Sequence, residues 1–157
     1  MENMTPTSQQ PVVHRITAAN DIEAIVTEIN AATWDAANEI VPYTVASLER
    51  YVAAANTHFL TVTINDAFAG MASAVVLAKP HSVGPWLYVD EVDVAVPWRR
   101  KGAGRALMTT LIDIGSDNRC TEVWLGTEPD NAAAMALYDA LEPDERMAFV
   151  GFTYETQ

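Results

Sequence analysis

A strand, a glycine turn and a helix follow one another within residues 92–108, and this succession constrains the fold more than any other part of the sequence. Valines at every second position predict a half-buried strand, which Pro97 ends because proline has no N–H to donate. Gly102 and Gly104 then allow unusual dihedral angles and a close approach of the backbone to a ligand. Apolar and small residues recur afterwards at helical spacing: Ala103, Ala106, Leu107, Thr110, Leu111 and Ile114. A helix that begins at such a turn offers free N–H groups and the positive end of its dipole, so the segment predicts a phosphate-binding site.

Cations gather at this turn, although the chain as a whole is strongly acidic. The formal net charge is −12, and four of the nine Lys and Arg residues lie here: Arg99, Arg100, Lys101 and Arg105. A cationic cluster at a helix N-terminus opposes the helix dipole, and a bound anion would relieve that opposition. The charge pattern alone leaves a solvated basic turn as the alternative.

The glycine spacing distinguishes between the known phosphate-binding motifs. The sequence has no Gly-x-x-x-x-Gly-Lys-Ser/Thr string, and Leu107 stands where the dinucleotide fingerprint has its third small residue. The pattern Arg99-x-x-Gly102-x-Gly104 resembles the pyrophosphate loop of the GNAT superfamily of N-acetyltransferases. In that family the backbone amides of the loop hold the pyrophosphate of acetyl-CoA, so the resemblance implies acetyl-CoA as the co-substrate.

Composition bounds the class of protein. A chain of 157 residues, half of them hydrophobic, is expected to form one domain over residues 1–157, with residues 1–11 as a flexible tail. No run of about 18 apolar residues is present, no signal peptide is expected from the first residues, and the single cysteine, Cys120, suits a reducing cytoplasm. The acidic balance argues against nucleic acid or an anionic membrane as partner and is compatible with a cationic substrate. The three histidines are scattered along the chain, so no metal site is expected.

The hydropathy pattern predicts alternating strands and helices along the whole chain. The expected strands cover residues 12–17, 59–64, 68–77, 86–96, 121–125 and 147–154, and the expected helices cover residues 21–34, 44–52, 102–117 and 131–141. Asn131, Ala134 and Tyr138 share one face of the last helix and resemble the second GNAT signature, Asn-x-x-Ala-x-x-Leu/Phe-Tyr. The resemblance implies an α/β (α+β) fold with a mixed, mostly antiparallel central sheet and helices on both faces.

The resemblance also implies roles for individual residues. Glu91 would be the general base, with Asp90 as second choice, and Tyr138 would protonate the leaving thiolate or hydrogen-bond to it. The alternative for Glu91 is an electrostatic clamp or a structural ion pair. The expected cofactor-binding residues are Val92, Asp93, Val94, Arg99, Arg100, Lys101, Gly102, Ala103, Gly104, Arg105 and Asn131. Asp93 is unusual on such a strand and has no role from the sequence alone.

The acceptor is harder to infer from sequence. The segment Tyr88-Val-Asp-Glu-Val and the tail from Asp144 to Phe149 resemble, more loosely, the aminoglycoside 3-N-acetyltransferase-like branch. In this fold the first two helices usually form the acceptor pocket, so Trp34, Asp35, Glu39 and Asp90 are expected to contact a small cationic amine, alongside Tyr43 and Trp86. A protein or peptide N-acetyltransferase and a non-catalytic acyl-CoA sensor remain as alternatives. Dimers are common in such folds, so a homodimer is compatible with the resemblance.

Overall fold

The computed structural model describes residues 9–157, and the chain divides into two compact units, one up to Gly126 and one from Thr127 onward. Among the described residues, no helix is long and apolar enough to cross a membrane. The expectation of a tail over residues 1–11 falls mainly on residues 1–8, which lie outside the described part of the chain. The expectation of one domain over the whole chain stays a prediction.

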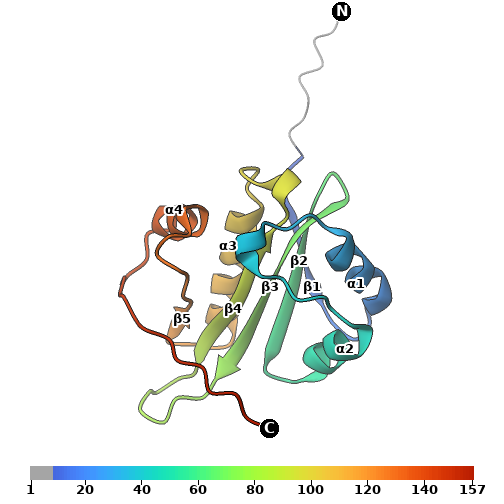
Figure 1. Cartoon of the computed structure of the whole chain (residues 1–157). Helices are drawn as coiled ribbons and strands as arrows, with labels where there is room; N and C mark the ends of the chain where they lie inside the picture. Colours follow the sequence, from blue (N-terminus) through green and yellow to red (C-terminus); the bar gives the residue numbers. More distant parts are fainter. Residues whose placement is uncertain (1–8) are drawn as a thin grey trace, which may run out of the picture. The chain divides into compact units, whose positions relative to one another are not determined.

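The first unit is built on a five-stranded sheet in the order β1-β2-β3-β4-β5 (Figure 1). The strands are β1 (Val12–Ile16), β2 (Thr57–Ile64), β3 (Ala67–Leu77), β4 (Trp86–Val94) and β5 (Glu122–Trp124). Neighbours from β1 to β4 are antiparallel, whereas β4 and β5 are parallel. The parallel pair requires a crossover, which the long helix between these two strands supplies. The mixed, mostly antiparallel sheet expected from the sequence is therefore confirmed.

Three α-helices accompany the sheet: α1 (Ile22–Ala31), α2 (Val45–Ala53) and α3 (Ala103–Asp117). Asp21 caps α1 by accepting from the Ala24 N–H, and Thr44 forms a capping box with Ser47 at α2. Two short 3₁₀ helices, Ala36–Asn38 and Val96–Trp98, lie in the connections. The helix starts expected at residues 21 and 44 follow from these caps, because each cap satisfies an N–H at the start of its helix.

Helices α1 and α2 cover one face of the sheet, and α3 covers the other (Figure 1). The α1–α2 side holds a cluster of buried residues: Ile16, Ile22, Val26, Ile29, Leu48, Phe59 and Met71. On the α3 side, Leu107, Leu111 and Ile114 are fully buried. Gly115 allows α3 to approach the sheet closely, because a Cβ there would lie 2.6 Å from Val123 Cγ2. Side chains of alternate sheet residues therefore enter two separate apolar layers.

A β-bulge interrupts β4 at its acidic segment. Ser73 pairs with Glu91 and Ala74 pairs with Val89, so Asp90 is an extra residue in the ladder. Leu87, before the bulge, faces α3, since it lies beside Gly115. Glu91, after the bulge, hydrogen-bonds to Tyr43 on the α1–α2 side. The bulge thus turns Glu91 to the face opposite that of Leu87, although simple alternation would place both on the same face.

The second unit contains α4 (Ala132–Ala140), which Asn131 caps by accepting from the Ala134 N–H at 3.1 Å. Arg146 forms an ion pair with Asp139 at 3.6 Å. The strand expected over residues 147–154 is wrong, because the structure has no strand in that segment. Its alternating apolar residues are exposed, Phe152 at 79% and Tyr154 at 85%. A strand exists only through pairing, so alternation without a ladder partner does not produce one.

Candidate functional site

The turn before α3 has the backbone geometry of a site for an anion. Gly102 has φ of +87° and serves as the N-cap of α3 without a side-chain hydrogen bond. Arg100, two residues earlier, also has a positive φ of 60°. The first N–H groups of a helix have no intrahelical partner, and here no side chain of the cap residue covers them. These N–H groups and the helix dipole together can bind an anion such as a phosphate.

The cations of the turn differ in the partners that their side chains contact. Arg99 donates from Nη1 to the Asp35 carboxylate at 3.0 Å, so two residues expected in different sites form an ion pair. The hydrogen bond from the Ala37 N–H, followed by that from Arg99, holds the pKa of Asp35 below its usual value. Lys101 places its Nζ 4.9 Å from the Trp98 ring centroid. Arg100 is exposed.

Two carboxylates of β4 line a pocket of about 200 Å³ next to α2. The lining residues are Tyr43, Ser47, Leu48, Tyr51, Phe59, Ser73, Asp90 and Glu91. The aromatic rings contact one another, since the Phe59 ring centroid lies 6.0 Å from that of Tyr43 and 6.2 Å from that of Tyr51. The bulge therefore brings the first and second choices for the general base, Glu91 and Asp90, to one pocket. We call it the α2–β4 pocket.

Glu91 is held by a phenol from the connection before α2. The Tyr43 hydroxyl donates to Glu91 Oε2 at 2.7 Å. Burial, followed by this hydrogen bond, raises the pKa of Tyr43 far above its usual range, so the phenol remains a proton donor. A second oxygen of Glu91 is left to accept from a substrate, because a carboxylate has two oxygens and several lone pairs.

Asp93 lies two residues beyond Glu91 and is held by Asn38. The Asn38 side-chain amide donates to Asp93 Oδ1 at 3.0 Å. Burial, followed by the charge of Glu91, raises the pKa of Asp93 to about 7, and the hydrogen bond from Asn38 opposes that rise. Asp93 therefore exchanges its proton near neutral pH, a property that no pattern in the sequence predicted.

The remaining residues expected to contact the acceptor lie outside the residues that line the α2–β4 pocket. The Trp34 indole donates to the Ile29 carbonyl and packs edge-on against Phe68, as a core tryptophan does. Asp35 is engaged with Arg99, and Glu39 ends a 3₁₀ helix with φ of 50°. The Lys79 ammonium lies over the Trp86 ring, with its Nζ 4.2 Å from the centroid of that ring. The proposed contacts of Trp34, Asp35 and Glu39 with an acceptor thus stay predictions.

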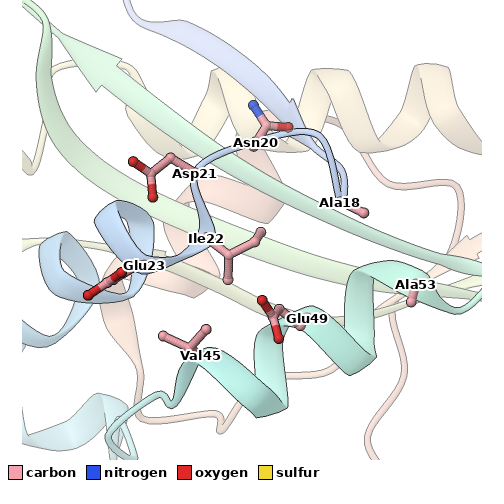
Figure 2. Close-up of a pocket in the computed structure, with 8 residues that line it drawn as sticks. All are labelled: Ala18, Asn20, Asp21, Ile22, Glu23, Val45, Glu49 and Ala53. Carbon is pink, nitrogen blue, oxygen red and sulfur yellow. The ribbon is translucent and has the colours of Figure 1, made fainter.

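A second, larger hollow of about 470 Å³ lies between the start of α1 and α2 (Figure 2). Val45, Glu49 and Ala53 line it from one face of α2, and Ile22 lines it from the first turn of α1. Its carboxylates include Asp21, which is already engaged as the cap of α1. No group of three or more metal-ligating side chains occurs anywhere in residues 9–157.

In the second unit, the structure places both motif residues on or beside α4. Asn131 uses its side-chain oxygen as the N-cap of α4, and Tyr138 is half-buried on the same helix. The expected roles of Asn131 at acetyl-CoA and of Tyr138 at the thiolate stay predictions.

The family model described as the acetyltransferase (GNAT) family matches residues 23–142, more than half of the chain. The chain belongs to the GNAT acetyltransferase family. The matched range includes both the glycine turn and the Asn131–Tyr138 helix. No curated protein matches the sequence.

Solved structures share the fold of this GNAT chain at low sequence identity. An aminoglycoside acetyltransferase, meta-AAC0020, from an uncultured soil metagenomic sample, in complex with sisomicin, has a TM-score of 0.80 at 19% identity, covering 94% of this chain and 97% of its own. The aminoglycoside acetyltransferase AAC(6')-Iy, in complex with a bisubstrate analogue of CoA, has a TM-score of 0.71 at 14% identity, covering 94% and 99%. A ribosomal-protein-alanine N-acetyltransferase from Brucella melitensis biovar Abortus 2308 has a TM-score of 0.71 at 14% identity, covering 92% and 99%. At these identities the likeness establishes the fold.

Sequence reasoning missed three residues that the structure brings to the acidic segment: Asn38, Tyr51 and Ser73. Ser73 carried a usable signal, because it is the one hydroxyl-bearing residue in an otherwise apolar strand, β3. Asn38 and Tyr51 carried none, because their contacts depend on how distant segments pack.

Proposed function

We propose that this protein transfers the acetyl group of acetyl-CoA to a primary amine of a small cationic molecule, by direct attack within a ternary complex. The observation that carries the proposal is the placement of Glu91 and Asp90 in one pocket of the strand that leads directly into the glycine turn. Family membership supports the chemistry, and the aminoglycoside acetyltransferases among the structural neighbours support an amine of this class.

The residues of the turn fit the diphosphate of acetyl-CoA. Gly102 leaves the start of α3 without a side-chain cap, and exposed Arg100 adds a positive charge beside it. A diphosphate bound there would receive N–H donors and gain from the helix dipole. When bound, acetyl-CoA supplies an acyl group activated as a thioester.

The α2–β4 pocket would first attract the amine and then remove its proton. Asp90 and Glu91 would attract the ammonium form, which predominates in water at neutral pH. Glu91, held by Tyr43, would then accept the proton that must leave before the nitrogen can attack. Tyr138 is proposed, from its motif alone, to protonate the thiolate that departs.

A protein or peptide acceptor is the second candidate, and the ribosomal-protein-alanine N-acetyltransferase among the neighbours favours it. A small-molecule transferase and a peptide transferase differ in the acceptor that they turn over with the same acetyl-CoA. The acidic charge of this chain supports a cationic acceptor in either case.

The test is release of CoA thiol from acetyl-CoA with a panel of aminoglycosides, alkylamines, amino acids and short peptides, each against a blank without acceptor. Turnover of small amines supports the proposal, and turnover of peptides alone overturns it in favour of the second candidate. Binding of acetyl-CoA is measured in parallel by calorimetry. Absence of such binding would overturn the assignment of the glycine turn.

Arg100→Gln and Arg119→Gln form a matched pair for the same calorimetry. Both arginines are exposed and have positive φ, but Arg100 precedes α3 whereas Arg119 follows it. The dissociation constant for acetyl-CoA is expected to rise roughly threefold or more in Arg100→Gln, as loss of a charge-assisted contact to phosphate predicts, and to stay unchanged in Arg119→Gln. Equal effects of both changes would point to the net charge of the protein instead of the turn.

A further inference from the structure

The α2–β4 pocket differs from a site for a hydroxylated sugar in how its own polar groups are used. On the basis of the proposed acetyl transfer, we propose that this pocket receives a primary amine carried on an unbranched alkyl arm, with the ammonium at Asp90 and Glu91 and the arm along the aromatic rings.

The hydroxyl groups that line the pocket already have partners inside the protein. The Tyr43 hydroxyl donates to Glu91 at 2.7 Å, and the Tyr51 hydroxyl donates to the Ala74 carbonyl at 3.1 Å. The Ser47 hydroxyl donates to the Thr44 carbonyl at 2.9 Å and also accepts within the capping box of α2. Hydroxyls of a bound sugar would therefore meet few free donors, and a buried hydroxyl without a partner is costly.

The two tyrosines are also fixed as proton donors to those partners. Burial raises the pKa of Tyr51 to about 12, and burial raises the pKa of Tyr43 further. Ser73 is 4% exposed and interacts with the Tyr51 phenol, so it offers little to a ligand. The polar groups left for a substrate are the carboxylate oxygens of Asp90 and Glu91.

The tyrosine rings supply the apolar wall that a ligand can reach, because Tyr43 and Tyr51 are both half-buried. Leu48 and Phe59 also line the pocket, but each is only 2% exposed and adds little surface of its own; the Phe59 ring contacts both tyrosine rings. Half-buried rings gain free energy from covering CH₂ groups, and aromatic rings near an ammonium add cation–π attraction. One end of the pocket is therefore suited to a positive charge, and the remaining wall is suited to an aliphatic chain.

The volume of the α2–β4 pocket suits an aminoalkyl arm better than a ring system. A cavity of about 200 Å³ is smaller than the range of about 300–1,000 Å³ typical of pockets that enclose a drug-sized ligand. It admits part of a molecule, and the part that fits the chemistry of the wall is an aminoalkyl end.

The experiment compares pentylamine with 6-amino-6-deoxyglucose in the CoA-release assay on the full chain. Both carry a primary amine on a CH₂ group, but one presents an alkyl chain and the other a hydroxylated ring. We expect kcat/KM to be at least about tenfold higher for pentylamine, in line with the penalty for leaving hydroxyls unpaired. Equal or better turnover of the sugar overturns this inference while leaving the proposed acetyl transfer intact.

Two variants complete the test. Asp90→Asn is expected to raise KM for pentylamine at least about threefold, because it removes one of the two charges at the ammonium position. Glu49→Gln removes an exposed carboxylate that lies on α2 outside this pocket and is expected to leave KM unchanged. Equal effects of the two changes, or no turnover of pentylamine by protein that binds acetyl-CoA, overturn the inference. Failure to bind acetyl-CoA overturns the proposed function itself.

Discussion

Glu91 and Asp93 lie two residues apart on β4, yet they have different partners. A phenol holds Glu91, whereas a side-chain amide holds Asp93. Burial, followed by the charge of Glu91, raises the pKa of Asp93 to about 7. The hydrogen bond from Tyr43 to Glu91 and the raised pKa of Asp93 each support a separate prediction at the scale of the residue.

The Asp93→Asn variant should become more stable than wild type as pH rises. Burial, then Glu91, raises the pKa of Asp93 from 3.8 to about 7 on folding. The unfolded state therefore binds fewer protons between these values, so the stability that Asp93 contributes is complete below pH 3.8 and is lost as pH rises through about 7. Asparagine mimics the protonated carboxyl and should avoid this loss, giving a gain of about 1–2 kcal/mol near pH 8 after allowance for screening by solvent.

Urea unfolding at pH values of about 5 and about 8 measures the Asp93→Asn effect. Asp113→Asn, on the exposed side of α3, is the matched control and should show the same difference from wild type at both pH values. A gain in Asp93→Asn that does not depend on pH would contradict the assigned titration.

Tyr43→Phe should reduce kcat/KM for the amine by roughly tenfold, because it removes a hydrogen bond to a charged group at the site of proton transfer. Tyr51→Phe removes a phenol hydroxyl from the same pocket, but that hydroxyl bonds to the Ala74 carbonyl and not to Glu91. The control should therefore retain most of the activity. Steady-state kinetics of both variants decide the matter, and equal losses would mean that Tyr43 acts only through the shape of the pocket.

At the scale of the element, the close contact between α3 and the sheet depends on Gly115. A Cβ at this position would lie 2.6 Å from Val123 Cγ2, which is too close without movement. Gly115→Ala should therefore lower the free energy of unfolding by about 1–3 kcal/mol through overpacking, despite the better helix propensity of alanine. The double variant Gly115→Ala/Val123→Ala removes the opposing methyl group and should recover part of the loss in urea unfolding. Additive losses in the double variant would contradict this steric explanation.

Elements that depend on local sequence were predicted well, and those that depend on pairing were not. The capped starts of α1 and α2, the hairpin of β2 and β3, and the glycine turn before α3 all follow from neighbouring residues. The bulge at Asp90 arises from the register between β3 and β4, and the absent strand at residues 147–154 reflects the lack of a ladder partner. Residue patterns contain no direct record of either, because both are set by a second segment.

The same distinction applies to the candidate site. Asp90, Glu91 and the cationic turn could be found from the sequence, because they lie in one continuous segment with a recognisable motif. Asn38 and Tyr51 could not, since Asn38 reaches Asp93 on β4 across 55 residues and Tyr51 reaches Ala74 on β3 across 23 residues. The Asp35–Arg99 ion pair, which spans 64 residues, was hidden for the same reason.

At the scale of the whole molecule, the net charge is −12, although four of the nine Lys and Arg residues lie in one turn. The two substrates should therefore respond differently to salt. As ionic strength rises from about 10 mM to about 100 mM, the Debye length falls from about 30 Å to about 10 Å. Long-range interactions with the charge of the whole molecule are then screened, whereas direct contacts within a site are screened much less. The cationic amine loses long-range attraction, so its KM should rise several-fold. Anionic acetyl-CoA loses both a long-range repulsion and part of its attraction to Arg100 and Lys101, so its KM should change by less.

Initial rates at varied concentrations of one substrate, with the other saturating, measure both constants. A neutral solute in place of salt controls for viscosity and osmolarity. Equal increases of both KM values would contradict this picture, because they would indicate a general effect of salt on the enzyme instead of a stronger effect on the cationic substrate.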